Sequence, residues 1–472
     1  MDAFILSRIQ FGFTIAFHII FPAFTIGLAS YLAVLEGLWL YTRREAFKNL
    51  YLFWVKVFAI AFGMGVVSGV VMSYQFGTNW SVFIAKTGNV IGPLLAFEVL
   101  TAFFLEASFL GVMLFGWKKV GPKLHFAATA LVALGTATSA FWILSANSWM
   151  HTPAGFATLA DGRLIATDYL QVIFNPSFPS RFAHMLLAAY ITTGLVVMAA
   201  SAWQYLRGRA SEESRIALRM AVLLVGVLMP LQILAGHESG VVAEEYQPAK
   251  VAAMEGWWED APTRGTILFA WPDEDNERNR FALEIPDTSR FLFTPEAELK
   301  GLKDFAPEDR PPVGIVFWGF RIMVGLGLGM LATGALGLWL WATRRLDRAK
   351  WFHWLAVLMG PSGFAAVLAG WVTTEVGRQP YIAYGVLRTA EALSPVSAGQ
   401  VATSLAFFFI VYAIVFSVGV LYILRLLRAG PQSEHGVPSA PDRGPNTTFA
   451  GAPLGGPEPA AAADRGKRWI WC

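Results

Sequence analysis

Runs of apolar residues recur along the chain and are separated by shorter polar segments. An α-helix needs about 20 predominantly apolar residues to cross the hydrocarbon core of a bilayer. The pattern predicts nine helices of this kind, at about residues 11–41, 52–77, 93–117, 124–148, 182–206, 216–237, 313–342, 351–376 and 403–427. It therefore indicates an all-α polytopic membrane protein, with transmembrane helices 1–6 in residues 1–237 and helices 7–9 in residues 313–428.

Basic residues are concentrated in alternate connections between these helices. Arg43 and Arg44 follow the first apolar run, whereas the next connection carries only Lys86. After the seventh run the chain reads TRRLDRAK, and the last run ends close to Arg428. Cytoplasmic loops are enriched in Lys and Arg. We therefore expect the N-terminus on the outer side of the membrane and the C-terminus on the inner side.

Two segments lie outside this pattern. Residues 238–312 are a long polar insertion, which the alternation places on the outer, periplasmic side. Within it, EEYQPAKVAAMEGWWED has a helical pattern and FALEIP is typical of a short strand. Residues 429–472 are rich in Pro, Gly and Ala, so we expect a disordered cytoplasmic tail.

Composition agrees with a membrane location and narrows the chemistry. Of 472 residues, 55% are hydrophobic and 15% are charged, whereas soluble domains carry about 25% charged residues. The net charge is only +3, and we expect no nucleic-acid partner. The one cysteine is Cys472, which excludes an internal disulfide framework, iron–sulfur clusters and Cys-ligated zinc. Any metal chemistry must therefore use His, Met, Asp or Glu.

Charged and metal-ligating side chains occur inside or at the ends of several predicted helices. Charged groups are costly in a bilayer and usually face a cavity, a partner or a cofactor. In GWVTTEVGRQPY, the spacing of Trp371, Glu375 and Arg378 is i, i+4 and i+7, which places them on one helix face. With the orientation above, the intramembrane groups gather toward the outer side, with Glu98 near the outer start of the third helix. They are His18, Glu98, His184, Arg321, Met323, Glu375 and Arg378.

Several of these residues have both a structural and a functional interpretation. A lone membrane histidine such as His18 is either hydrogen-bonded to another helix or a metal ligand. A methionine such as Met323 is usually core filler, but its neighbour Arg321 suits the propionates of a heme. Because electron-transfer hemes favour His with Met as axial ligands, His184 and Met323 are candidates for a six-coordinate heme.

Two further pairs of residues are candidates for proton movement or binding. Glu98 and Glu106 are eight residues apart, about 12 Å along one side of a helix. Acids so placed either bond to neighbouring helices or mark a proton or ion route. Lys250 and Glu255 flank an apolar turn before two tryptophans. That segment is either a solvated amphipathic helix or a Trp-rich surface suited to a lipid-soluble ring compound.

Longer motifs decide between two classes of function. Without them, the acids favour a proton- or ion-coupled membrane transporter that titrates at Glu98, Glu106 and Glu375. Six motifs point elsewhere: SRIQFGFTIAFH, YQFGTNWS, FFLEASFLG, ALGTATSAFWILSANSWM, FRIMV and GWVTTEVGRQP. Through them, residues 1–428 resemble the larger, heme-bearing subunit I of cytochrome bd-type quinol oxidases. The segment 238–312 is similar to the short form of that family's quinol loop, as in its cyanide-insensitive branch.

The resemblance implies a function in the bacterial cytoplasmic (inner) membrane. Quinol would be oxidised at the outer side and dioxygen reduced to water with protons from the inside, which generates a proton motive force without pumping. The implied cofactors are a low-spin heme b, a high-spin heme b and a heme d, or a further heme b in place of heme d. The implied partners are subunit II, a small single-helix subunit, quinol, dioxygen and the lipid bilayer.

The resemblance also implies roles for single residues. His184 and Met323 are similar to ligands of the low-spin heme, and His18 and Glu375 to ligands of the high-spin pair, without deciding which serves which heme. The other implied roles are a proton path at Glu98 and Glu106, neutralisation of heme or semiquinone charge at Arg321 and Arg378, quinol binding at Lys250 and Glu255, and heme-site positions at Asn147 and Trp371. The chain departs from the family at Tyr381, where tryptophan usually follows GRQP, so we expect packing or hydrogen bonding there to differ.

Overall fold

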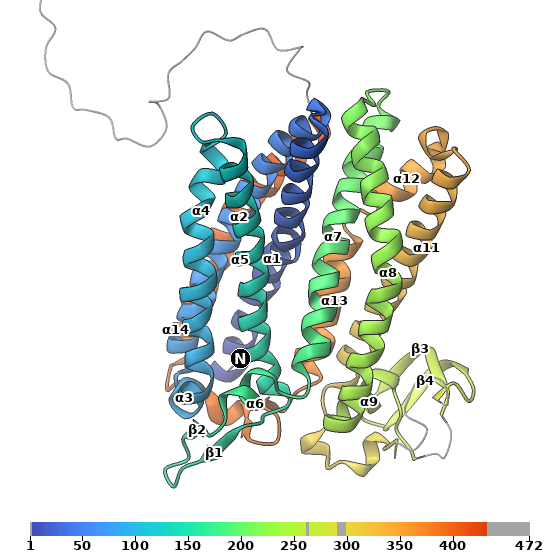
Figure 1. Ribbon diagram of the computed structural model, residues 1–472. Helices are drawn as coiled ribbons and strands as arrows, with labels where there is room; N and C mark the ends of the chain where they lie inside the picture. The colour runs from blue at the N-terminus through green and yellow to red at the C-terminus, as the bar shows by residue number, and fades with distance from the viewer. Residues whose placement is uncertain (1, 261–263, 290–298, 432–472) are drawn as a thin grey trace, which may run out of the picture. The chain divides into compact units, whose positions relative to one another are not determined.

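The computed structural model describes residues 2–260, 264–289 and 299–431 (Figure 1). Within those ranges, nine helical spans are long and apolar enough to cross a membrane, as predicted. In chain order they are α1 (Ala3–Thr42), α2 (Glu45–Thr78), α3 with α4 (Ser81–Glu98 and Phe104–Phe115), α5 (Pro122–His151), α7 (Phe178–Leu206), α8 (Glu212–Tyr246), α11 (Val313–Ala342), α12 with α13 (Lys350–Met359 and Ser362–Val376) and α14 (Ala398–Ala429). The all-α, multi-pass fold class is confirmed, while the side of the membrane that each terminus faces stays a prediction.

Several helices continue beyond the apolar runs that predicted them. The third span starts at Ser81, twelve residues before the expected start at 93, because a helix that leaves the hydrocarbon tolerates polar residues such as Lys86. The span Ser81–Phe115 is 35 residues long, and Glu98 lies at its centre. The prediction that Glu98 lies at the outer start of this helix was therefore wrong. A π-helical segment, η1 (Val99–Phe103), follows Glu98 directly.

The helices pack in two groups that share α1. In the first group, α1 contacts α2, α5 and α14, and α5 contacts α3 and α4. In the second group, α7, α8, α11 and α13 each contact the next, and α13 contacts α7. Helix α1 joins the groups through α7 and α13. The main buried core runs along these helices and includes Leu28, Leu32, Trp54 and Phe58, all almost fully buried.

Short strands and helices gather at the end of the bundle where Figure 1 marks the N-terminus. After α5 come β1 (Phe156–Thr158), β2 (Leu164–Ala166) and α6 (Tyr169–Ile173), with Ala157 opposite Ile165 in an antiparallel pair. A second antiparallel pair, β3 (Thr266–Asp273) and β4 (Arg278–Ile285), contains the strand predicted at FALEIP. A third, β5 (Tyr381–Ala383) with β6 (Leu387–Arg388), follows α13 and leads into a 3₁₀ turn, η5 (Thr389–Ala392).

The insertion between the sixth and seventh spans begins inside a helix. Helix α8 continues to Tyr246, so residues 238–246 are helical and the expected helix end at 237 is too early. Helix α9 (Pro248–Glu255) follows directly and confirms the helical pattern of that segment. The insertion then contains β3, β4 and the 3₁₀ turns η2 (Leu302–Asp304) and η3 (Pro307–Asp309); a further 3₁₀ turn, η4 (Leu346–Arg348), joins α11 to α12. Of the predicted disordered tail, residues 432–472 lie outside the described residues.

Candidate functional site

A cavity of about 860 Å³ lies within the first helix group and reaches α13. This volume is typical of pockets for small ligands and cofactors, about 300 to 1,000 Å³. Most of its lining is apolar, but seven residues identified from the sequence also line it: His18, Glu98, Glu106, Asn147, Trp371, Glu375 and Arg378. The fold therefore brings together candidate residues from four membrane spans and the turn after α13.

His18 extends from α1 toward α2, with its Nδ1 3.1 Å from Ser68 Oγ. The Ser68 hydroxyl donates to the carbonyl of Met64 or Gly65, 3.0 and 2.9 Å away. Because a hydroxyl has one hydrogen, Ser68 accepts from the Nδ1–H of His18, and Nε2 keeps a free lone pair. A Cβ on Gly69 would lie 3.2 Å from His18 Cε1, so this glycine makes room for the ring. The imidazole is held in the tautomer that suits a metal ligand.

Glu98 and Glu106 both face α5. Ser139 Oγ donates to Glu98 Oε1 over 2.7 Å. Glu106 is 6% exposed, and a Cβ on Gly135 would lie 2.7 Å from its Cγ. Gly135 and Ser139 are four residues apart on α5, so the two acids follow one face of that helix. Glu98 thus makes an interhelical hydrogen bond, as its structural interpretation requires, and both acids also line the cavity.

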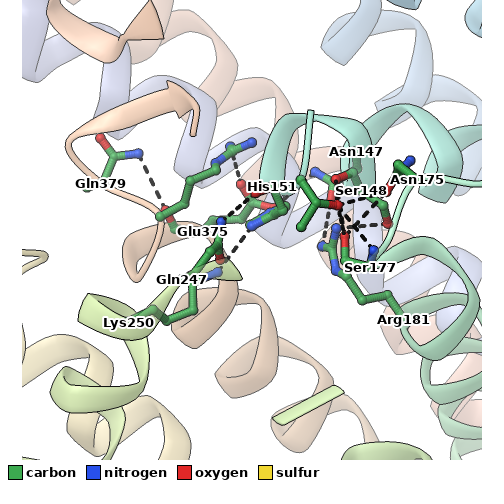
Figure 2. A network of polar contacts seen from close by, with 12 residues as sticks. Asn147, Ser148, His151, Asn175, Ser177, Arg181, Gln247, Lys250, Glu375 and Gln379 are labelled. Atoms are coloured by element: carbon green, nitrogen blue, oxygen red, sulfur yellow. Dashed lines mark hydrogen bonds and ion pairs between the residues drawn. The ribbon is translucent and has the colours of Figure 1, made fainter. Parts of the chain in front are cut away.

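Glu375 is the centre of a polar network at the end of α13 (Figure 2). Its Oε1 accepts from Asn147 Nδ2 over 3.0 Å and lies 3.2 Å from His151 Nε2. Its Oε2 is paired with Arg378, which is buried. Both carboxylate oxygens are therefore held by charged or polar groups, which fixes the orientation of the acid.

Arg181, in the first turns of α7, extends this network on the far side of Asn147 (Figure 2). Its Nη2 donates to Asn147 Oδ1 over 2.5 Å, and its Nη1 donates to Ser148 Oγ over 3.0 Å. Since a guanidinium only donates and a carboxylate only accepts, the amide of Asn147 has one orientation between Arg181 and Glu375. Asn147 thus joins a cation of α7 to the acid of α13.

Lys250 enters the network from α9, with its Nζ 3.1 Å from His151 Nδ1. Its side chain is buried, and burial, followed by the charge of Arg181, lowers the pKa of Lys250 well below the usual lysine value, although Glu375 opposes this shift. A Cβ on Gly377 would lie 2.8 Å from Lys250 Cγ, so the turn after α13 leaves room for the lysine stem. Lys250 and Glu375, which the sequence assigned to different sites, are joined through one imidazole.

The surroundings of α9 differ from both interpretations of its sequence. Most of the helix is buried, including Val251 and Ala252, so it is not a solvated amphipathic helix. Trp257 and Trp258 are 5% and 6% exposed and belong to small cores of the insertion, so they form no Trp-rich surface. Helix α9 packs on α8, which precedes it directly, and on α11, which begins almost 60 residues later, so the sequence could not reveal the second of these partners.

Glu255, at the other end of α9, pairs with Arg321 of α11 over 2.8 Å. Arg321 also donates to the Ile267 carbonyl over 2.7 Å, and its guanidinium lies 4.7 Å from the centroid of the Phe317 ring. Burial raises the pKa of Glu255, while the charge of Arg321 opposes that shift. The sequence assigned Glu255 to quinol and Arg321 to charge neutralisation, and the fold makes them an ion pair.

His184 and Met323 do not line the large cavity but belong to the second helix group. His184 Nε2 lies 3.3 Å from Gln232 of α8, and a Cβ on Gly236 would be 3.1 Å from its Cε1. A Cβ on Gly370 of α13 would lie 2.9 Å from Met323 Sδ. Small residues on α8 and α13 therefore make room for both side chains, within four helices that contact one another in a ring.

Tyr381 has its own polar contacts. Its hydroxyl donates to Asp309 Oδ1 over 2.9 Å, and the Arg388 guanidinium lies 5.2 Å from the centre of its ring. Arg388 also donates to Asp309 over 2.5 Å. The phenol thus ties the strand after α13 to the end of the insertion between α8 and α11.

Comparisons with known proteins now identify the family. The family model for cytochrome bd terminal oxidase subunit I matches residues 6–431. The chain belongs to this family. It is 35% identical to cytochrome bd ubiquinol oxidase subunit 1 of Bacillus subtilis over 459 residues, which cover 94% of this chain and 97% of the relative. It is 33% identical to cytochrome bd-II ubiquinol oxidase subunit 1 of Escherichia coli over 506 residues, covering 92% and 98% of the two chains.

The fold of this cytochrome bd subunit I is also that of a solved relative. The bd oxidase structure from Geobacillus thermodenitrificans matches with a TM-score of 0.85 and 32% identity, covering 91% of this chain and 99% of that one. Family membership implies hemes, a subunit II and a multi-pass membrane location. It also decides between the two classes of function in favour of an oxidase and against a transporter.

The residues of this cytochrome bd subunit fit hemes. His18 offers Nε2 to the cavity, and imidazole is a good ligand for iron. Within the described part of the chain, His184 Nδ1 and Arg378 Nε and Nη1 are buried and have no hydrogen-bond partner. A guanidinium so placed suits the carboxylates that a heme carries. Among the described residues, no three His, Cys, Asp or Glu side chains are placed together so that they could hold a metal ion.

Two residues of the network were missed in the sequence of this cytochrome bd subunit. His151 is the last residue of α5 and is followed by Thr-Pro, so it has the pattern of a loop residue. Arg181 lies at the start of an apolar run, where a basic residue is usually interpreted as part of the connecting loop. One signal was available for His151, because it lies four residues after Asn147 and therefore on the same face of α5.

Proposed function

We propose that this chain is the catalytic subunit of a terminal quinol oxidase in a bacterial cytoplasmic membrane, acting as a quinol:oxygen oxidoreductase. One observation carries the proposal, together with family membership. Seven residues that a heme-bearing subunit I would need line a single cavity, although they are scattered from His18 to Arg378 in the sequence. The names of the relatives support a quinol, either ubiquinol or menaquinol, as the electron donor.

His184 and Met323 would hold a low-spin heme b in the second helix group. His18 and Glu375 would serve a high-spin pair at the large cavity, a heme b with a heme d or with a further heme b. When bound, these hemes supply the redox centres that pass electrons from quinol to dioxygen. The contribution of the chain is to fix the ligands: Ser68 sets the tautomer of His18, and Asn147 orients the Glu375 carboxylate.

The quinol site would lie beside α9, at Lys250 and Glu255. Both side chains are buried polar groups, and the buried apolar residues Val251 and Ala252 lie between them on α9, a combination that suits a lipid-soluble ring with two hydroxyl groups. Arg321 holds Glu255 by an ion pair, and His151 holds Lys250 by a hydrogen bond. The binding groups are therefore oriented before the substrate arrives.

Glu106 and Glu98 would carry protons toward the dioxygen site. Both acids line the cavity and follow one face of α5, and Ser139 continues the polar surface at Glu98. Quinol oxidation at the outer side with proton uptake from the inside would generate a proton motive force without a pump. Acids spaced along a membrane span are typical of such routes.

A second membrane subunit would cover part of the lipid-facing surface, and a small single-helix subunit would join it. The face of α14 supports this, because Phe407, Ile414 and Leu421 are 63%, 62% and 65% exposed and recur at intervals of seven residues. Such a stripe is satisfied by lipid or by another apolar helix.

An optical spectrum of the purified oxidase tests the proposal. We expect reduced-minus-oxidised bands of low-spin and high-spin heme, together with dioxygen consumption driven by a short-chain quinol. His18→Ala should remove a high-spin signal. A control is His353→Ala, since the His353 ring is buried, bonds the Leu346 carbonyl and does not line the cavity. The proposal fails if the wild-type protein shows no heme bands.

A further inference from the structure

His151 joins two parts of the proposed site through its two ring nitrogens (Figure 2). Nε2 lies 3.2 Å from Glu375 Oε1, and Nδ1 lies 3.1 Å from Lys250 Nζ. The side chain is almost fully buried. Its backbone carbonyl accepts from Gln247 Nε2 over 2.8 Å, so the connection between α8 and α9 is tied to the end of α5 as well.

The direction of these hydrogen bonds follows from the groups involved. A carboxylate only accepts, so the proton on Nε2 is donated to Glu375. Nδ1 is then the accepting nitrogen, and Lys250 donates to it. The three side chains form one directed series from the Lys250 amino group through the imidazole to the Glu375 carboxylate, in which loss of one bond changes the other.

We infer that His151 is a positioning residue that couples the quinol site to the carboxylate at the high-spin hemes. The inference rests on the proposed function, in which Lys250 binds quinol and Glu375 ligates a high-spin heme. A quinol that accepts from the Lys250 amino group adds a second acceptor beside His151 Nδ1, and so changes the length and strength of the hydrogen bond between Lys250 and His151. The hydrogen bond from His151 to Glu375 then changes as well, so binding of quinol alters the position of the Glu375 carboxylate.

The coupling is reciprocal. If quinol binding alters the position of the Glu375 carboxylate, a change at Glu375 must alter quinol affinity by the same factor. Asn147 and Arg378 also contact Glu375, but among the described hydrogen bonds neither of them reaches Lys250. Among the contacts described for Glu375, the one through His151 leads to α9.

Substitution of His151 tests the inference in the assembled oxidase. His151→Leu has a similar volume and removes both hydrogen bonds, whereas His151→Gln keeps one donor and one acceptor. We expect His151→Leu to raise the KM for a short-chain quinol about tenfold, which is about 1.4 kcal/mol, and to shift the high-spin heme bands while the low-spin bands stay. His151→Gln should restore both readouts toward wild type. A matched control is Thr152→Val, because Thr152 is the next residue, is buried and bonds to Asn175 and Ser177 instead.

A second variant keeps the test decisive if His151→Leu does not assemble. Lys250→Met does not touch Glu375, yet it should shift the high-spin bands because His151 loses its Nδ1 partner. In a His151→Leu background that assembles, Lys250→Met should add no further shift.

The inference is overturned if His151→Leu leaves either the quinol KM or the high-spin bands as in wild type. It is equally overturned if Lys250→Met leaves those bands unshifted. Failure of the proposed function looks different, because the wild-type protein would then lack heme bands or quinol-driven dioxygen consumption.

Discussion

Gly370 on α13 provides a test of Met323 that leaves the methionine itself intact. A Cβ at position 370 would lie 2.9 Å from Met323 Sδ, whereas ordinary contacts at such distances fall between 3.4 and 4 Å. In Gly370→Ala the sulfur must therefore move by about 0.5 to 1 Å, as judged from those contact distances. If Met323 ligates the low-spin iron, this displacement competes directly with the iron–sulfur bond.

The size of the effect follows from the cost of overpacking. Inserting a methyl group into a packed interior typically costs about 1 to 3 kcal/mol. If the strain falls on the ligand, the equilibrium between bound and released Met323 shifts by a factor of about 5 to 150. We expect part of the low-spin heme signal in the reduced-minus-oxidised spectrum of Gly370→Ala to convert to high-spin, with the other hemes retained.

The matched control is Gly327→Ala on α11, one helical turn beyond Met323. A Cβ at position 327 meets nothing within 4 Å. This variant therefore tests a Gly-to-Ala change on the helix that carries Met323, without a clash against the sulfur. Its spectrum should be that of the wild type. A full low-spin signal in Gly370→Ala, or equal losses in both variants, would refute the argument that Met323 is a ligand held against Gly370.

Three further variants address single contacts. Met323→Leu should convert or empty the low-spin heme while the helical fold persists by circular dichroism, and an unchanged spectrum would remove Met323 from the ligand set. Burial and the charge of Arg181 lower the pKa of Lys250 in the folded protein. In the unfolded chain, this lysine has its usual pKa of about 10.4. At a pH between these two values, Lys250 is protonated in the unfolded chain but not in the folded one. The free energy of unfolding of the wild type in detergent should therefore increase as the pH rises through this range, and the increase should be smaller in Lys250→Met. Identical dependence of the unfolding free energy on pH in the two proteins would contradict this. Tyr381→Phe removes the hydrogen bond to Asp309 and should cost about 0.5 to 1.5 kcal/mol in thermal unfolding, with heme spectra unchanged; a spectral change would show that Tyr381 acts on the heme site.

The membrane spans could be predicted because their physical requirement is local. A bilayer demands about 20 apolar residues in one stretch, and such a stretch can be read directly from the sequence. Helix ends could not be read as well, because a helix that leaves the hydrocarbon continues wherever packing supports it. Ser81 and Tyr246 mark two such extensions, and the first of them moved Glu98 from the edge of its span to the centre.

The candidate site was partly predictable for a related reason. An acid such as Glu375 in an apolar run is costly, so its presence alone indicates a cavity, a partner or a cofactor. His151 gave no such signal, since it stands at the end of a run where histidines are often solvated. Its bond to Glu375 joins residues 224 positions apart, and only the packing of α5 against the segment after α13 brings them together.

The Glu375 carboxylate lies among several cationic side chains. Among the described residues of this network, Arg181, Lys250 and Arg378 bring three cationic groups toward one carboxylate, and Asn147 and His151 join two of them to it. Buried charges that lack partners are strongly destabilising, and two nitrogens of Arg378 are without a hydrogen-bond partner there. Anionic groups bound in the cavity would offset this excess, and the carboxylates of a heme have the required charge. The two arginines would also stabilise an added electron on a heme bound beside them, so a network with a structural role would favour electron arrival at this end of the cavity.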